Sequence, residues 1–468
     1  MSPDAARPRP RRPARVALAL IGHALVALAL ARSDGHESPF ALALVLLGGA
    51  AVVLGLLASR PAPWARSSTV VEPLAWVLAL VSTISLFDLP PGRSIAATVS
   101  YAPFLALSAA ATLLVASYAV DAARGWPPSP AAPASARRAA LFAVAASLGA
   151  WLLFASPAPG IDVWTVHQQG AAALLHGRSP YAEGVVTTED SYSHARAIDV
   201  YAYPPLNAIL TTAGYAPTGD TRWAQLAAIL GGAVLLWVIA RRTSRSPVFA
   251  DLLAANLLFH PRGLFVLEQA WGEPLALPLL YGFALAALTR RPRLAAILAG
   301  LLIALKQHFV LYLPALALVP GMGVPGTLVA IGVAAATYVP FVIATPRGLF
   351  EAVVMHHVNN PFRADSLSLP ATMAKLLDWK LPSWLGPLAA LASFGVLARV
   401  PRRIDALLLA ASLTFFLFFV LGRQAFANYY YLLDATLLLA AAAAADEPAT
   451  ASPSDSDTEP PRSGHLEA

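Results

Sequence analysis

The chain has 468 residues, of which 57% are hydrophobic and only 12% are charged. Because soluble domains carry about 25% charged residues, this composition excludes an ordinary soluble protein and indicates a membrane protein with several spans. The chain contains no cysteine, which excludes disulfide bonds and cysteine-based metal sites. The net charge of +6 comes mainly from arginines in short loops, so it does not indicate a nucleic-acid partner.

The N-terminal part of the sequence predicts a basic cytoplasmic segment at 1–15 and a group of transmembrane helices within 16–130. The apolar run at 16–31 is similar to a signal peptide, but we interpret it as an uncleaved first span because more spans follow. Either interpretation places residue 35 outside the cytoplasm. The other spans of this half are expected at 39–58, 71–89, 96–119 and 138–156.

Basic residues predict the orientation of these spans. Arginines follow the second span at Arg60 and Arg66, and the fourth span at Arg124, Arg137 and Arg138. The alternate loops are poorer in basic residues, and short basic loops face the cytoplasm. The positive-inside rule therefore places the N-terminus in the cytoplasm and the loop after the fifth span outside.

That first outer loop, 157–221, is the longest polar interval of the sequence. Segment 162–175 is moderately apolar and compatible with a helix that Gly177 ends. Segment 205–217 is apolar but too short to span. We expect both segments to form short helices at the membrane interface. The acids and histidines of the loop are Asp162, Glu183, Glu189, Asp190, Asp199, His167, His176 and His194.

In the C-terminal half, further spans are expected at 222–240, 248–260, 273–289, 325–345, 383–399, 404–421 and 428–445. Segment 346–382 forms a second outer loop, and the acidic tail 446–468 is predicted to be disordered in the cytoplasm. The predicted fold class is an all-α polytopic membrane protein, a bundle of about 10–13 transmembrane helices.

Segment 294–319 carries Lys306, Gln307 and His308 near its middle. The distribution of basic residues requires both of its ends on the cytoplasmic side. Two half-spanning helices that meet near Lys306 satisfy this requirement, because irregular backbone at membrane depth is tolerated against protein. The alternative is one long helix, which would invert the topology of every later span.

Asp162 and the pair Lys306 and His308 stand out as candidate functional residues. Asp162 precedes a predicted helix, so it is either an N-cap or a general base at the membrane surface. Lys306 and His308 lie within an apolar segment, where ionisable groups are costly and function is the default hypothesis. A cation there suits an anionic headgroup or a departing phosphate, and the alternative is a side chain that snorkels to the interface.

Further polar clusters lie in the predicted outer loops. Arg262 and Glu268 could pair with each other, and adjacent histidines on a helix point apart, which argues against a shared metal at His356 and His357. The tyrosines after Arg423 are typical of an interfacial aromatic belt. No nucleophile elbow, phosphate-binding loop or metal-ligand spacing is present in the sequence.

Residues of about 140–440 resemble glycosyltransferase family 87, a branch of the GT-C superfamily typified by polyprenyl-phosphate-mannose-dependent mannosyltransferases. The resemblance begins at Asp162, continues through 169–177 and Arg178-Ser179-Pro180-Tyr181, and includes Tyr203-Pro204-Pro205-Leu206. It is weaker at Glu268-Gln269 and Glu273, and at Lys306, where Gln307 stands in place of a common proline. The resemblance implies a GT-C-like catalytic module at 138–445, with the catalytic acid in the first outer loop.

The implied activity moves a hexose, with mannose expected, from a polyprenyl-phosphate sugar to a lipid or glycan acceptor on the outer face. Asp162 is the implied general base, and a single displacement inverts the anomeric centre. No metal and no cofactor are expected, and membrane lipids are the other partners. The expected donor-phosphate and substrate residues are Lys306, His308, Arg262, Glu268, Gln269, His356, His357, Arg363, Arg423, Tyr181 and Tyr203.

The arginine-, alanine- and proline-rich composition favours a bacterial origin, and hence the bacterial plasma membrane, with both termini cytoplasmic and the active site facing outward. Two alternatives to a glycosyltransferase stay open. One is a transporter or flippase of a lipid-linked or polar solute, although such proteins often show internal repeats and no repeat is visible here. The other is an enzyme of different chemistry, such as a lipid-linked polymer ligase.

Overall fold

The computed structural model describes residues 13–58, 70–119, 133–182, 184–185, 199–244 and 246–444. Within these ranges every regular element is a helix, apart from an isolated β-bridge between His36 and Ser366. The all-α prediction is therefore confirmed for this part of the chain. The tail after residue 444 and most of the basic N-terminal segment lie outside it, as do Glu183, Glu189, Asp190 and His194.

Six of the described helices have the length and apolar composition of a membrane span, which makes the chain a helical membrane protein. They are α1 (Pro13–Ser33), α2 (Pro39–Leu57), α3 (Val71–Asp88), α6 (Pro133–Ala155), α9 (Arg222–Thr243) and α15 (Gly323–Ala344). Six shorter apolar helices are α4 (Ala102–Ala116), α10 (Pro247–Leu258), α12 (Glu273–Leu288), α13 (Pro292–Leu305), α19 (Leu385–Leu397) and α20 (Ile404–Val420). The last helix is α21 (Ala427–Ala444). A total of about 10–13 spans stays a prediction.

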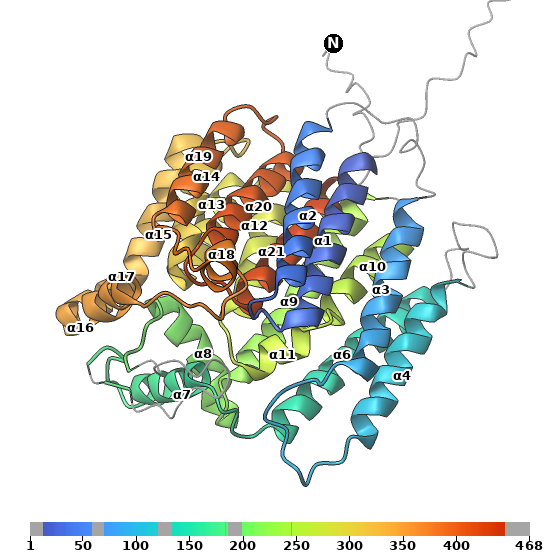
Figure 1. Cartoon of the computed structure of the whole chain (residues 1–468), viewed down its shortest axis with the longest axis horizontal. Helices are drawn as coiled ribbons and strands as arrows, with labels where there is room; N and C mark the ends of the chain where they lie inside the picture. Colours follow the sequence, from blue (N-terminus) through green and yellow to red (C-terminus); the bar gives the residue numbers. More distant parts are fainter. Residues whose placement is uncertain are drawn as a thin grey trace, which may run out of the picture.

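Two short helices lie at one end of the bundle, where the first outer loop was expected. α7 (Asp162–Leu175) and α8 (Pro205–Thr218) match the predicted segments closely, and neither has the composition of a span. Pro205 opens α8, where a missing amide proton costs no hydrogen bond, and Gly219 ends it with a φ of 77°. Figure 1 shows both helices at the lower end of the bundle.

The helix is interrupted at Lys306, as predicted. α13 ends at Leu305, Lys306 has an extended backbone (φ −155°, ψ 141°), and a 3₁₀ segment, η2, follows at Gln307–Tyr312. A single turn, α14 (Leu313–Leu316), then leads to α15. The alternative of one continuous helix is therefore wrong. At the interruption, the Lys306 ammonium pairs with the Glu273 carboxylate at the start of α12.

The second outer loop contains short helical pieces rather than a span. They are α16 (Pro346–Phe350), a π-helical turn at Glu351–Met355, α17 (His356–Asn359) and α18 (Leu369–Leu377). Another short helix, α11 (Gly263–Glu268), lies between α10 and α12. Figure 1 shows α16, α17 and α11 toward the same end of the bundle as α7 and α8.

The N-terminal helices pack directly against the predicted catalytic module. Arg15 on α1 is buried and forms an ion pair with Asp405 on α20, with its Nη1 3.0 Å from Oδ2. Farther along α1, His23 lies 3.2 Å from Asp434 on α21. Figure 1 shows α1 and α2 beside α20 and α21. The described helices before residue 130 are thus integrated with the remainder.

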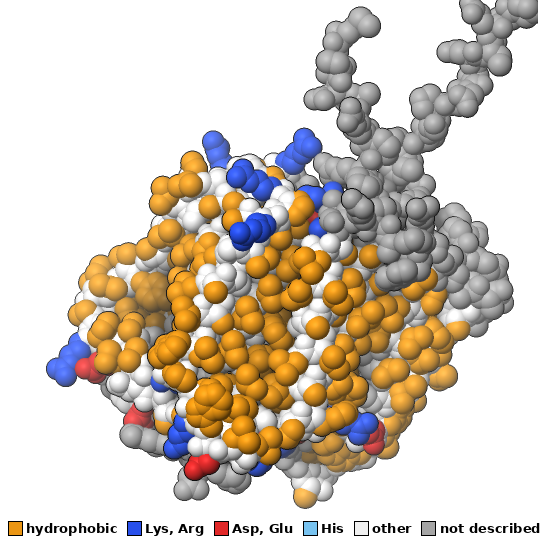
Figure 2. Space-filling model, turned by 45° about the horizontal axis from the view of Figure 1, so that its top comes forward, with side chains coloured by type: hydrophobic (Ala, Val, Ile, Leu, Met, Phe, Trp, Pro, Cys, Tyr) orange, Lys and Arg blue, Asp and Glu red, His pale blue; other side chains and the backbone are white. Residues whose placement is uncertain are grey.

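Charged side chains gather at the two ends of a hydrophobic belt. Figure 2 shows a broad hydrophobic face whose upper end carries mainly Lys and Arg, while its lower edge carries charges of both signs. Lipid-facing helices have this distribution, because charged side chains avoid the hydrocarbon region.

Close packing of α13 on α15 depends on Gly300. A Cβ atom there would lie 2.5 Å from the Ala330 carbonyl oxygen, whereas a Cβ at Gly332 would meet nothing within 4 Å. We expect Gly300→Ala to lower the free energy of unfolding by about 1–3 kcal/mol through overpacking. Gly332→Ala should be neutral or stabilising by up to ~1 kcal/mol, because alanine favours helix. Thermal unfolding in detergent measures both, and equal melting temperatures would contradict the packing described.

The absence of cysteine allows a direct test of membrane orientation. Ser383 and Arg290 are both exposed and lie before α19 and after α12, respectively. We expect Ser383→Cys to react with a membrane-impermeant maleimide on intact cells, and Arg290→Cys to react only after permeabilisation. Labelling of Arg290→Cys in intact cells would reverse the predicted topology.

Candidate functional site

Asp162 is the first residue of α7, and its side chain is only 6% exposed. Ile161 occupies the N-cap position with an extended backbone (φ −130°, ψ 137°), so the interpretation of Asp162 as the cap residue is wrong. A carboxylate in the first turn of a helix interacts favourably with the helix dipole. The sequence thus places a buried acid at the bundle end, in the first turn of a helix that does not span.

Tyr203 is influenced by the charges of both Asp162 and the Lys306–Glu273 pair. Burial, together with the charges of Asp162 and Glu273, raises the pKa of the Tyr203 hydroxyl well above its usual value of 10. The phenol is therefore neutral and remains a hydrogen-bond donor at physiological pH. The Lys306 ammonium lies 5.8 Å from the centre of the Tyr203 ring, within the range of a cation–π contact.

Lys306 forms a buried ion pair with Glu273, the first residue of α12. Asn428 in the first turn of α21 donates to the same carboxylate oxygen, Oε1, at 2.7 Å. The ammonium also lies 5.2 Å from the centre of the Tyr429 ring. The pair is neutral as a whole, and it joins α12, α13 and α21 behind Tyr203.

His167 on α7 belongs to a hydrogen-bonded chain beside Tyr203. Its ring centre lies 4.6 Å from that of Tyr203, and its Nδ1 lies 3.3 Å from the Tyr201 hydroxyl. The Tyr201 hydroxyl also lies 3.4 Å from Asn207 Oδ1, so Tyr201 connects His167 to Asn207. Burial, and then the charge of Lys306, lowers the pKa of His167 to about 3. The imidazole is therefore neutral, and its Nε2 has no hydrogen-bond partner within the protein.

Near the hydrogen-bonded series formed by His167, Tyr201 and Asn207, three buried polar atoms have no hydrogen-bond partner. They are His167 Nε2, Asn207 Nδ2 and Glu273 Oε2, each on a side chain with no exposed surface. Gly272 allows the Asn207 amide to lie there, because a Cβ at position 272 would be 2.5 Å from Nδ2. Leaving such groups unpaired is costly, so these three atoms are candidate contacts for a bound ligand or for water.

The segment that carries these tyrosines is held by the residues at the helix interruption. Gln307 Nε2 and His357 Nε2 both lie 2.9 Å from the carbonyl oxygen of Ala202. The Tyr181 hydroxyl donates to the carbonyl oxygen of Tyr203 at 2.7 Å. His357 and Tyr181 were expected to contact substrate, and the structure shows them fixing the backbone at 202–203.

Glu268 lies away from this cluster, with its carboxylate occupied by the connection between α3 and α4. It accepts from the amides of Arg93 and Ser94 at 2.7 and 2.8 Å, and from the Ser156 hydroxyl at 3.0 Å. Gln269 adds a fourth bond at 2.9 Å. A carboxylate with four donors has little capacity left for a substrate, so the structure gives Glu268 and Gln269 an anchoring role.

Arg262 is likewise occupied at the ends of the N-terminal helices. It is 1% exposed, donates to the Pro90 carbonyl oxygen at 2.9 Å, and pairs with Asp34 at 2.7 Å. The predicted alternative, an ion pair between Arg262 and Glu268, is not among the ion pairs of the described residues. Arg262 therefore ties α11 to the connections that follow α1 and α3.

The other predicted substrate residues also have protein partners. Arg363 makes a two-pronged ion pair with Asp365, at 2.9 and 2.8 Å, and Arg423 donates to the carbonyl oxygens of His357 and Val358. His356 stacks edge-on against His357, with 5.3 Å between ring centres. His308 is enclosed by Phe309, Phe415, Phe419 and Tyr429.

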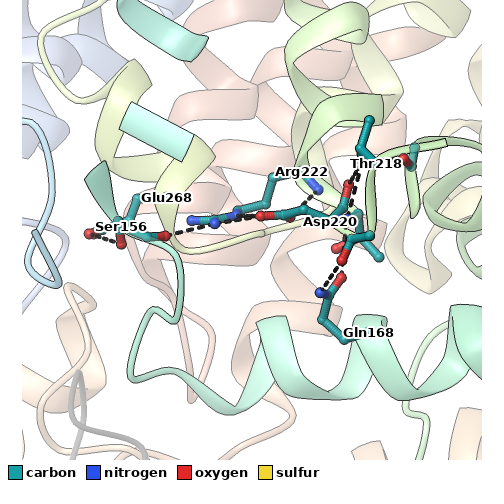
Figure 3. A network of polar contacts seen from close by, with 9 residues as sticks. Ser156, Gln168, Thr218, Asp220, Arg222 and Glu268 are labelled. Atoms are coloured by element: carbon teal, nitrogen blue, oxygen red, sulfur yellow. Dashed lines mark hydrogen bonds and ion pairs between the residues drawn. The ribbon is translucent and has the colours of Figure 1, made fainter. Parts of the chain in front are cut away.

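A second polar network, distinct from the residues around His167 and Lys306, holds α7 in place and is shown in Figure 3. Ser156 lies between Glu268 and Arg222, which donates to the Ser156 carbonyl oxygen at 2.7 Å. Arg222 also pairs with Asp220, and Gln168 on α7 bonds to the backbone of Gly219 and Thr221 at 2.8 and 2.9 Å. α7 is thereby fixed to the connection between α8 and α9.

The backbone just before Asp162 is held by the N-terminal helices. The Gly160 amide donates to the Ser94 hydroxyl at 3.1 Å, and the Ser94 amide in turn donates to Glu268. Sequence reasoning placed 1–130 apart from the catalytic module and did not detect this contact. It also left Glu273, Asn428, His167 and Asn207 without a role, although acids and amides at the starts of apolar helices were a visible signal.

No group of three or more His, Asp or Glu residues in the described ranges is arranged to hold a metal ion. Comparison with known proteins adds no assignment. No protein family, no curated protein and no solved structure matches the chain.

The buried pair predicts a specific pattern of stability. Lys306→Met should lower the free energy of unfolding by about 3–5 kcal/mol, because it leaves the Glu273 charge unpaired. Adding Glu273→Gln should restore most of that loss, since the remaining groups are neutral and Asn428 keeps an acceptor. Thermal unfolding of both variants in detergent checks this. A double variant less stable than Lys306→Met alone would show that the two side chains are not coupled.

Proposed function

We propose that this chain is an integral membrane glycosyltransferase of GT-C type. It moves a hexose, with mannose favoured by the resemblance to glycosyltransferase family 87, from a polyprenyl-phosphate sugar to a lipid or glycan acceptor. The reaction takes place at the end of the bundle that carries α7 and α8, which is the outer face in the proposed topology. The setting is a bacterial plasma membrane with both termini in the cytoplasm.

The observation that carries this proposal is the position of Asp162. Its buried carboxylate lies in the first turn of a non-spanning helix, electrostatically coupled to Tyr203 and through it to the Lys306–Glu273 pair. A lipid-linked substrate presents its reacting group at this depth, between hydrocarbon and water. The arrangement resembles a general base beside a charged centre at the place where such a substrate would be bound.

The cluster of unpartnered atoms supports a sugar as the ligand. Glu273 Oε2 is an acceptor and Asn207 Nδ2 is a donor, while His167 Nε2 accepts or donates according to the tautomer of the neutral ring. Sugar hydroxyls both donate and accept, so a hexose could satisfy all three atoms. The neutral state of His167 and the internal pairing of Lys306 with Glu273 make this region suitable for an uncharged polyol.

In the proposed reaction, Asp162 takes the proton of the acceptor hydroxyl as its oxygen attacks the anomeric carbon. The new glycosidic bond forms while the bond between that carbon and the phosphate oxygen breaks, and polyprenyl phosphate leaves with the bonding electrons. The proton stays on Asp162 until it is lost to water. One displacement inverts the anomeric centre. The Lys306 ammonium has N–H donors besides the one directed at Glu273, and these donors stabilise the leaving phosphate.

A transporter or flippase is the second candidate, and one observation favours it. Discontinuous helices with a charged residue at the interruption are typical of substrate sites in secondary transporters. The interruption between α13 and η2 at Lys306 has this form. The two functions differ in their products, since a transporter moves its solute unchanged.

Replacing Asp162 with asparagine separates the possibilities. Asp162→Asn keeps the size of the side chain and removes the proton acceptor, so we expect turnover to fall by roughly 10²-fold or more. The assay incubates purified protein with radiolabelled polyprenyl-phosphate mannose and a lipid extract, and measures labelled product. Binding of the donor and thermal unfolding should change little.

The matched control is Asp88→Asn, which makes the same chemical change at an exposed position at the end of α3. It should leave turnover unchanged. Equal activity of the wild type and Asp162→Asn would contradict the proposed role of Asp162. Movement of the donor across vesicle membranes without any glycosidic product would favour the transporter.

A further inference from the structure

The end of α18 and the short segment between it and α19 expose an unusual amount of apolar surface. Leu376, Leu377, Trp379 and Trp384 are 61%, 63%, 57% and 59% exposed, respectively. On α19, which follows directly, Leu388 and Leu391 are also more than half exposed, so the apolar surface continues along that helix. Tryptophan with leucine beside a hydrophobic helix is typical of residues at the boundary between lipid tails and headgroups.

This exposed segment is attached to a firmly held base. Ser368 caps α18 by accepting from the Ala371 amide at 3.3 Å, and the Leu367 amide donates to the carbonyl oxygen of Ala425 at 2.9 Å. Lys375 pairs with Glu37 at 2.5 Å. The exposed leucines and tryptophans of this segment are thus held in place by hydrogen bonds and an ion pair. They lie at the bundle end that also carries the connection between α1 and α2.

A hollow of about 600 Å³ with charged side chains in its lining lies beside these apolar side chains. It is lined by His36, Glu37, Phe362, Ala364, Asp365, Ala374, Lys375 and Lys380. Both carboxylates are matched, Glu37 by Lys375 and Asp365 by the two-pronged contact with Arg363. Within the described residues, Lys380 has no carboxylate within ion-pair distance. Lys380 is therefore the one charged side chain of the lining without an ion-pair partner among the described residues.

We propose that this hollow binds the phosphate headgroup of an anionic phospholipid, with Lys380 as the principal charge. The acyl chains of that lipid extend along Leu376, Leu377 and α19, and the two tryptophans lie at the level of the headgroups. A lipid is the occupant that combines an anionic phosphate with tails for the adjoining apolar surface. The site is independent of the proposed glycosyl transfer, because it uses none of the residues around Asp162.

Native mass spectrometry of the purified full chain tests the charge. The probes are phosphatidylglycerol and phosphatidylcholine with identical acyl chains. We expect the wild type to retain phosphatidylglycerol in preference, and Lys380→Gln to weaken its binding roughly fivefold, as for the loss of one lysine near an anionic surface. The control is Arg347→Gln, which removes an exposed cation already paired with Glu351 at 2.8 Å and should leave the preference unchanged.

Two further measurements separate other occupants. Soluble glycerol phosphate should not displace phosphatidylglycerol, because it lacks the tails. Brominated lipids should quench less fluorescence in Trp379→Phe than in the wild type, because Trp379 lies at lipid depth. Lack of preference for phosphatidylglycerol, an unchanged preference in Lys380→Gln, competition by glycerol phosphate, or equal quenching in the two proteins would each overturn the proposal.

Discussion

An ammonium group among apolar helices has to be matched by a negative charge, and the Lys306–Glu273 pair meets this requirement. α13 ends at Leu305, beside this pair, and the chain continues as a 3₁₀ segment. Gln307 in that segment donates to the Ala202 carbonyl oxygen, and Ala202 lies between the two tyrosines of the candidate site. The charged pair and the backbone at 201–203 are thereby held together.

The helix that carries Asp162 is supported by parts of the chain that are far apart in sequence. Ser94, from the connection between α3 and α4, holds the Gly160 amide, and Glu268 holds Ser94. Gln168 binds the backbone after α8. Reacting groups have to be held within a fraction of an ångström, and supporting hydrogen bonds of this kind provide that precision. The N-terminal helices are accordingly part of the candidate site's foundation.

Local patterns in the sequence predicted the long apolar helices and the two short helices α7 and α8, but not the short helices α11 and α16–α18 or the contacts between helices. The apolar runs predicted the spans, Gly177 and Pro205 marked the limits of the short helices, and Lys306 within an apolar run predicted the interruption. Arg262 and Glu268 contact residue 34 and residues 90–94, which are all more than 170 positions away in the sequence. No local pattern encodes such contacts. For the same reason Glu273 was not recognised as the counter-charge of Lys306.

These contacts also bear on the choice between transfer and transport. Alternating access would require the interrupted helix to move relative to its neighbours. Lys306 is bound to α12, Asn428 on α21 binds the same carboxylate, and Gln307 is bound to the Ala202 backbone. Moving η2 would separate these polar groups within an apolar surrounding. Each neutral group left unpaired there costs about 1–3 kcal/mol, and an unpaired charge costs more. The described contacts therefore hold the interruption in one arrangement, and opening a gate there would have to replace all of them.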